Sequence, residues 1–275
     1  MFKKSMIVVL ILLCCMAISG VCLSEDSNVL KITAKELSYA NLYRQIDIPL
    51  NAKTVTLEYY IKVASTGMEG LSFGPGVHFW WDTANQGVAI KVNSAYGDGR
   101  LGSIRFFDPT NRGMDKAGYK PSDTLPVPIY SKVWYGYKVQ LDSEKLRFYI
   151  REIEGEWIEL ELAATDRATA ISLPPDGLII GIGGPQEFGP NPRFRNSIND
   201  QTRLENSKVR SVYFDNIVVT VDGKVVFTET FERSIDKLES DGWDFATDPI
   251  NEGTVFDVTS ESGNRPLPTI IEFSM

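Results

Sequence analysis

Apolar and polar residues alternate one by one in several short runs, and this period limits the fold more than any other feature of the chain. In residues 54–62, Val55, Leu57, Tyr59 and Ile61 fall on one face and mainly polar side chains on the other. Successive side chains of a β-strand point to opposite faces, so this run predicts a half-buried strand. Similar runs cover residues 43–48, 77–82, 88–93, 104–107, 133–141, 146–151, 157–162, 178–182, 211–221, 224–231 and 255–258.

Turn-forming residues separate these runs. Asp222-Gly223 is the strongest hairpin signal, since both residue types accept the positive φ of a type I′ turn, and shorter acidic turns fall at 142–144 and 154–156. The best helical candidate, residues 234–240, is one or two turns long. We therefore predict an all-β fold, a two-sheet antiparallel β-sandwich.

Two long proline-containing segments, residues 108–129 and 184–208, interrupt the strand rhythm. Loops of this length inside a compact domain are usually either functional or surface insertions. We expect two long loops here, and both interpretations of them stay open.

The first residues have the pattern of a secretory signal. Lys3 and Lys4 precede an uncharged run at 6–18, and small and then acidic residues follow. We predict a signal peptide at residues 1–24 and a secreted or cell-surface protein. Residues 6–23 are also just long enough for an uncleaved signal anchor, which is the alternative.

The cysteines support this division of the chain. All three, Cys14, Cys15 and Cys22, lie in the signal segment, so a cleaved chain would contain no disulfide. Cys22 also suggests a lipid-modified N-terminus, but Val21 is too large for the position before a lipidated cysteine. A length of 275 residues suits one large domain. We place the sandwich at residues 25–232 and a C-terminal tail packing on it at 233–275.

The charge balance excludes one class of partner. The chain has 28 Lys+Arg and 36 Asp+Glu, a formal net charge of −8. Because nucleic-acid binding depends on neutralising phosphates with cations, an acidic chain argues against a nucleic-acid partner.

Three segments together resemble a known superfamily. Residues 134–141 followed by 146–150 give a Trp-opened strand, a short turn and an aromatic-bearing strand. Residues 178–183 form a strand ending in glycine, and residues 211–219 contain Phe-Asp-Asn followed by alternating apolar residues. This order resembles the concanavalin A-like lectin/glucanase superfamily, which includes laminin G-like modules. The resemblance implies a jelly-roll sandwich, and it leaves lectin, glycoside hydrolase, polysaccharide lyase and noncatalytic surface roles open.

Strand parity places aromatic and cationic side chains opposite the core-facing set. Flat aromatics can stack on sugar rings, and amides and guanidinium groups can bind hydroxyls or carboxylates. We therefore predict a carbohydrate-binding face on one sheet, with a glycan partner that is neutral or anionic. Its candidate residues are His78, Trp80, Asn93, Arg105, Trp134, Gln140, Arg147 and Tyr149, with Lys91, Lys138, Arg151 and Trp157 on the same parity. The alternative is ordinary surface pairing with Glu58, Glu159 and Glu161.

No catalytic set is convincing. The only run of alternating carboxylates, Glu152, Glu154 and Glu156, falls where a hairpin must turn, which favours a solvated acidic turn. The single histidine, His78, has no positioned partner in the sequence pattern. We predict a noncatalytic carbohydrate-binding domain. The alternatives are a polysaccharide-active enzyme and a structural surface protein that associates with itself.

Calcium is the metal that the resemblance implies. Asp108, Asn111 and Asp115 lie in one loop at EF-hand-like spacing, and Asp215 is a further candidate ligand. The alternative is that these residues form Asx-type turns without a metal.

Overall fold

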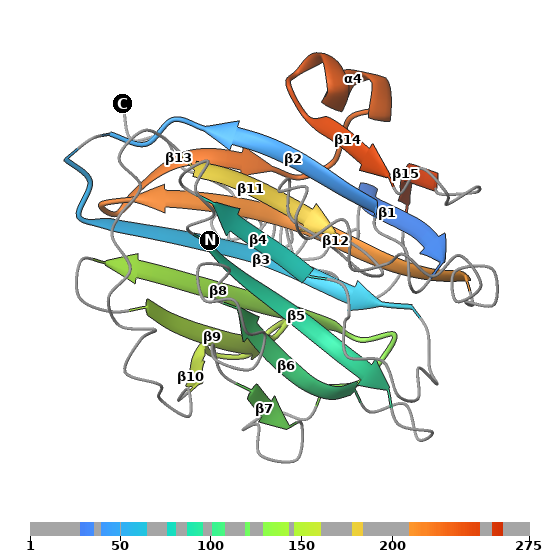
Figure 1. Cartoon of the computed structure of the whole chain (residues 1–275), viewed down its shortest axis with the longest axis horizontal. Coiled ribbons are helices and arrows are strands. Elements are labelled where there is room, and N and C mark those ends of the chain that lie inside the picture. Colours follow the sequence, from blue (N-terminus) through green and yellow to red (C-terminus); the bar gives the residue numbers. More distant parts are fainter. Residues whose placement is uncertain are drawn as a thin grey trace, which may run out of the picture.

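A computed structural model describes residues 28–35, 40–49, 51–64, 76–80, 87–95, 101–107, 119–121, 129–142, 146–160, 178–183, 209–247 and 255–260. The predicted signal segment, residues 1–24, lies outside this part. The described residues form two antiparallel sheets stacked as a sandwich, so the predicted fold class is confirmed (Figure 1). In the described ranges, no helix has the length and apolar character needed to cross a membrane.

The first sheet has eight strands. Its order across the sheet is β10 (Ile158–Leu160), β9 (Leu146–Glu152), β8 (Trp134–Asp142), β3 (Thr54–Val63), β12 (Val209–Val221), β1 (Asn28–Lys35) and β15 (Val255–Ser260), with β13 (Lys224–Glu229) also paired to β12.

The second sheet has seven strands. They run in the order β14 (Asp244–Thr247), β2 (Ala40–Ile46), β11 (Leu178–Gly183), β4 (Gly76–Trp80), β5 (Gly87–Ala95), β6 (Leu101–Phe107) and β7 (Tyr119–Pro121). Two strands from the region predicted as a tail, β14 and β15, add to the edges of the two sheets beside β2 and β1.

The core lies between the sheets and follows the predicted alternation. Every second residue of β3 and β8 is buried in it, and Tyr59 stacks on Tyr137 with ring centroids 5.6 Å apart. The second sheet contributes Leu42, Ile46, Ile180 and Ile182 to the same cluster. Burial of alternating residues from both layers is what holds a two-sheet sandwich together.

Strand β12 pairs with three neighbours and contains a β-bulge. Its first half pairs with β1 and its second half with β13, while β3 pairs along the other side with a shift between Asp215 and Val218. At the shift, Asn216 has φ +47°, and the Oδ1 atom of Asp215 accepts a hydrogen bond from the Asn216 backbone N–H at 2.7 Å. The Phe-Asp-Asn segment is therefore the point where the strand bends.

The hairpin predicted at Asp222-Gly223 is confirmed. It joins β12 to β13, and both residues have positive φ, +47° and +78°. The Asp222 carboxylate also accepts hydrogen bonds from the backbone N–H groups of Lys53 and Thr54, both at 2.9 Å. This side chain ties the turn to the start of β3.

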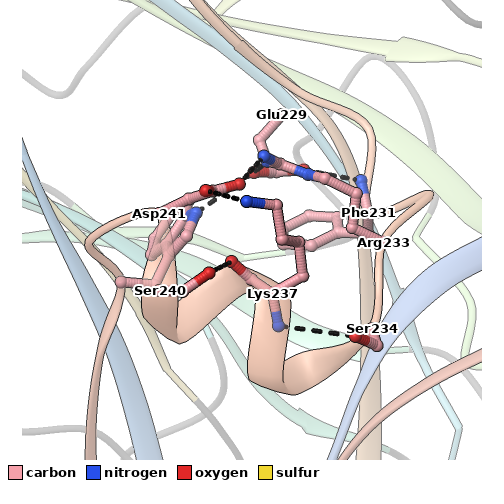
Figure 2. Close-up of polar contacts among 8 residues, drawn as sticks. Glu229, Phe231, Arg233, Ser234, Lys237, Ser240 and Asp241 are labelled. Atoms are coloured by element: carbon pink, nitrogen blue, oxygen red, sulfur yellow. Dashed lines mark hydrogen bonds and ion pairs between the residues drawn. The ribbon is translucent and has the colours of Figure 1, made fainter.

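After β13, a group of polar contacts that we call the C-terminal latch turns the chain towards the second sheet (Figure 2). Glu229 is 2 % exposed and accepts hydrogen bonds from the Phe231 N–H at 2.9 Å and the Trp243 indole N–H at 3.1 Å. Arg233 bridges Glu229 and Asp241, and the Lys237 ammonium bonds to Asp241 at 2.8 Å. Each charge in the latch therefore faces an opposite charge.

The latch encloses a short helix, α4 (Ile235–Ser240), which confirms the predicted one or two turns. The Ser234 hydroxyl caps its first turn by accepting from the Lys237 N–H. At its end the Gly242 N–H bonds to the Glu239 carbonyl and the Trp243 N–H to the Leu238 carbonyl. This is a Schellman motif, and it explains why glycine, at φ +95°, stands at residue 242.

Candidate functional site

The face of the first sheet that points away from the core carries the aromatic and cationic side chains of interest. On β8, Tyr135, Tyr137, Val139 and Leu141 belong to the core. Residues at the alternate positions of β8, and their cross-strand neighbours on β3 and β9, therefore lie on the outer face.

In one part of this outer face, the side chains are mostly shielded from solvent. Val29, Tyr60 and Trp134 are buried together there, with Tyr213 and Ile153 packed against them. Lys62 is only 8 % exposed and lies 4.4 Å from the centroid of the Tyr213 ring. We call these six residues the dry cluster.

Cations and aromatics alternate in one row across the dry cluster. In register, Lys31 faces Tyr213, Tyr213 faces Lys62, and Lys62 faces Trp134, so the row crosses β1, β12, β3 and β8. Lys31 lies 5.8 Å from the Tyr213 ring and Lys62 lies 5.3 Å from the Trp134 ring. These cation–π contacts hold the row together from within the molecule.

The other part of the outer face is partly open to solvent. It lies over β8, β9 and the entry to β10, and we call it the polar strip. All of its side chains are half-buried, and they are Lys138, Gln140, Arg147, Tyr149, Arg151 and Trp157.

At one end of the strip, Gln140 of β8 faces Arg147 of β9. The Arg147 guanidinium forms an ion pair with Asp142 at 2.6 Å, and this hydrogen bond raises the pKa of Arg147. Next to it, burial and then the charge of Glu159 raise the pKa of Tyr149. Tyr149 therefore stays a neutral phenol with a hydroxyl donor at physiological pH.

At the other end of the strip, two cations share one indole. The Lys138 ammonium lies 4.5 Å from the Trp157 ring centroid and the Arg151 guanidinium carbon lies 4.3 Å from it. Lys138 also lies 4.6 Å from the Tyr149 ring, and Arg151 donates a hydrogen bond to the Tyr60 hydroxyl. The strip is thus a compact set of flat rings and donors.

The structure divides the predicted carbohydrate-binding residues between the two sheets. Trp134, Gln140, Arg147 and Tyr149 lie in β8 and β9 of the first sheet. His78, Trp80, Asn93 and Arg105 lie in β4, β5 and β6 of the second sheet. The expectation of one shared face is wrong, because alternation gives the face of a strand but not the sheet to which the strand belongs.

The expectation that Trp134 is available to stack on a sugar is also wrong. Parity places it on the outer face, as predicted, but it is only 5 % exposed because it packs in the dry cluster. Its indole Nε1 is buried without a hydrogen-bond partner among the described residues. Trp134 is therefore not an open platform for a sugar ring. Tyr149 and Trp157 are partly exposed aromatics of this face, as is Tyr213, which lies between Lys31 and Lys62.

The acidic run at 152–156 forms a turn, as the sequence predicts. The Gly155 N–H bonds to the Glu152 carbonyl at 3.0 Å, and Glu152, Glu154 and Glu156 are exposed. The three carboxylates do not line one strand, so they lack the arrangement that a glycoside hydrolase of this fold would need.

The predicted calcium ligands fall in two places. Asp108, Asn111 and Asp115 lie outside the described residues. Asp215 lies in the β12 bulge, is 2 % exposed, and its Oδ1 already accepts from Asn216. Within the described ranges, no group of three or more His, Cys, Asp or Glu side chains is arranged to hold a metal ion.

Two residues of this face were missed by sequence reasoning. Tyr60 lies on the polar parity of β3 and was assigned no role, yet it receives the Arg151 hydrogen bond. Gly136 faces Tyr60 on one side and Arg151 on the other. The signal available was the glycine in the Trp-Tyr-Gly-Tyr run, since glycine within a strand often marks a close approach.

Comparison with known proteins gives weak similarities of fold. No protein-family model matches the chain, and no curated protein sequence matches it. A heptameric SAP-like pentraxin from Limulus polyphemus is 12% identical, with 84% of this chain and 95% of the pentraxin covered and a TM-score of 0.42. An endo-acting O-glycanase structure from the human gut microbiota is 11% identical, with 74% of this chain and 85% of the glycanase chain covered and a TM-score of 0.45. The alginate lyase from Klebsiella pneumoniae is 12% identical, with 62% of this chain and 60% of the lyase covered and a TM-score of 0.36. The fold assignment therefore rests on the two sheets themselves.

Proposed function

We propose that this chain is a secreted or cell-surface carbohydrate-binding protein that acts without catalysis, and that the polar strip is its binding surface. The composition of the strip carries the proposal. Tyr149 and Trp157 offer flat apolar surface, and Gln140 and Arg147 offer hydrogen-bond donors beside them. A sugar has an apolar ring face and a rim of hydroxyl groups, so it is bound by aromatics with nearby donors.

The exposure of these side chains supports the strip over the dry cluster. All six strip residues are half-buried, so a ligand can reach them without repacking the protein, while their buried parts hold them in place. In the dry cluster, Trp134, Tyr60 and Lys62 are each less than a tenth exposed and their rings already contact one another or a cation. Rings and cations are also in contact in the strip, so the difference between the two regions is that these three side chains are buried while the strip side chains stay partly exposed.

The test is binding of the full chain to a panel of neutral and acidic polysaccharides, with calcium and with a chelator. We expect Tyr149→Ala to weaken binding roughly 2- to 10-fold, the loss of one aromatic contact. Tyr130→Ala is the matched control, because Tyr130 is 41% exposed and lies outside the strip. A wild-type chain that binds no polysaccharide, or a Tyr149→Ala variant that binds like wild type, would overturn the proposal.

Two further readouts refine it. Release of oligosaccharides from a bound polysaccharide would replace the noncatalytic role with a polysaccharide-active enzyme. Binding that disappears with the chelator would support a calcium site at Asp108, Asn111 and Asp115, whereas unchanged binding would remove calcium from the proposal.

A second candidate function is self-association at the cell surface, and one observation favours it. Strand β13 pairs only with β12 among the described strands, and two consecutive residues at its start, Val225 and Val226, are 40% and 42% exposed. An edge strand with exposed valines can pair with another chain. Light scattering across concentration tests this candidate, with Val226→Lys expected to suppress any oligomer that forms.

A further inference from the structure

Lys138 and Arg151 are held close together by aromatic rings. Both cations lie against Trp157, at 4.5 Å and 4.3 Å from the ring centroid. They come from neighbouring strands, since Lys138 faces Tyr149 in register and Arg151 faces Gly136. Like charges repel, so two cations gathered on one ring are stable only if other interactions, or a ligand, compensate them.

Among the described residues, both cations contact aromatic rings rather than carboxylates. Within the described part of the chain, no acid lies in ion-pair contact with Lys138 or Arg151, whereas Arg147 of the same strip bonds to Asp142 at 2.6 Å. Burial lowers the pKa of both groups, and Glu58 opposes this shift in each without reaching ion-pair distance. The Arg151 Nε atom is buried and has no hydrogen-bond partner among the described residues. Glu156 likewise opposes the lowering of the Arg151 pKa, and Glu58 faces Lys138 in register. The pair is therefore partly desolvated, and among the described residues no acid contacts it directly.

Glycine at residue 136 makes this arrangement possible. A Cβ atom there would lie 3.0 Å from Cγ of Arg151 and 3.1 Å from both Trp157 and Tyr60. Three side chains from three parts of the first sheet thus converge over the one residue that has no side chain. Any other residue would push them apart.

We propose that Lys138, Arg151 and Trp157, packed over Gly136, form a subsite for the carboxylate or sulfate group of an acidic sugar. An anion held there gives both cations a direct ion-pair partner, which the described residues do not supply. The guanidinium fork and the ammonium group fix its oxygen atoms, and Trp157 lies beside the sugar ring. This subsite rests on the proposed function, because it assigns the ligand class of the same strip.

The experiment measures the affinity of the full chain for three matched oligosaccharide sets: uronate, sulfated and neutral. We expect Lys138→Met to weaken binding of an acidic set about tenfold, the loss of one charge-assisted contact, and to leave neutral binding unchanged. Lys224→Met is the control, because it removes the same charge from an exposed residue outside the strip. The difference between uronate and sulfated sets identifies which group the subsite prefers.

Two more variants keep the test informative if Lys138→Met does not fold. Arg151→Lys keeps the charge but loses the fork, and Gly136→Ala keeps both cations but displaces Arg151 and Trp157. Each should reduce the preference for acidic over neutral sugars at least 3-fold while the melting temperature shows that the variant is folded. An unchanged acidic preference in Lys138→Met and Arg151→Lys would overturn the subsite while leaving carbohydrate binding intact.

A final arm separates the subsite from the proposed function. If the wild-type chain binds no oligosaccharide, the proposed function fails, and inorganic sulfate is then titrated against tryptophan fluorescence. A saturable change that Lys138→Met abolishes retains the anion subsite. No change, or the same change in Lys138→Met, removes the subsite as well.

Discussion

Charged side chains gather both in the C-terminal latch and in the polar strip, and the two groups are partnered differently. In the latch, Arg233 bonds to Glu229 and Asp241, and Lys237 bonds to Asp241. In the strip, Lys138 and Arg151 contact aromatic rings and no acid within ion-pair distance among the described residues. A charge that forms an ion pair within the protein stabilises the fold, whereas a charge without such a partner can form one with a ligand. The following predictions test this difference.

The largest effect is expected at Glu229. Glu229→Ala removes the acceptor for the Trp243 indole, the Phe231 N–H and Arg233 at once. We expect a loss of about 3–5 kcal/mol in the free energy of unfolding, because buried partners are left unpaired. Urea unfolding followed by circular dichroism measures it.

Two control variants are compared with Glu229→Ala. Glu239→Ala removes an exposed carboxylate from α4 and should change the unfolding free energy by less than about 0.5 kcal/mol. Lys138→Met should change it equally little, because Lys138 has no ion pair among the described residues to lose. If Lys138→Met proves as damaging as Glu229→Ala, then the strip is structural and the contrast between the two regions is wrong.

A smaller effect is expected at Gly242. Gly242 and Gly223 both have positive φ, so alanine at either should cost about 1–2 kcal/mol of backbone strain. At Gly242 a Cβ would also lie 2.5 Å from the Arg44 guanidinium, whereas at Gly223 it would meet nothing within 4 Å. We therefore expect Gly242→Ala to be the more destabilising, as measured by thermal unfolding. Equal losses would show that Arg44 simply moves away.

The smallest effect is a pH dependence of the latch. The Lys237 hydrogen bond, with Arg233 and Arg44 nearby, holds the pKa of Asp241 below its ordinary value of 3.8. A carboxyl group with a lowered pKa adds stability above its unfolded pKa and loses it as pH falls through the folded pKa. Melting temperatures of wild type and Asp241→Asn should therefore differ at neutral pH and converge on acidification below 3.8. A difference that stays constant with pH would exclude a contribution from the Asp241 charge.

Much of the fold could be predicted from alternation alone. The buried faces of β3 and β9 match the predicted ones, for example at Leu57, Ile61 and Phe148. The pattern fails at a strand end, where Val133 has the same parity as the buried Tyr135 and Tyr137 but is 42% exposed. Val133 precedes the first residue of β8, so no cross-strand neighbour covers it.

The candidate site was harder to predict, because it depends on pairing between distant strands. Alternation places Trp134 and Trp80 on outer parities but cannot show that they lie in different sheets. Nor can it show that Lys62 and Tyr213 pack Trp134 away from solvent, since these neighbours come from strands far apart in the sequence. Lys138, Arg151 and Trp157 were on the predicted outer face, but their shared contacts follow only from the register.

The position of β14 and β15 has a consequence for the timing of folding. These two strands complete the edges of the two sheets, and they pair with β2 and β1, which lie near the start of the described chain. During synthesis, β14 and β15 leave the ribosome long after β2 and β1, with which they pair. Pairings between strands so far apart in the sequence form slowly. A nascent chain of this design stays incomplete for most of its synthesis. A chain truncated before β14 would expose β1 and β2 as edge strands in place of β15 and β14, and exposed edges invite aggregation.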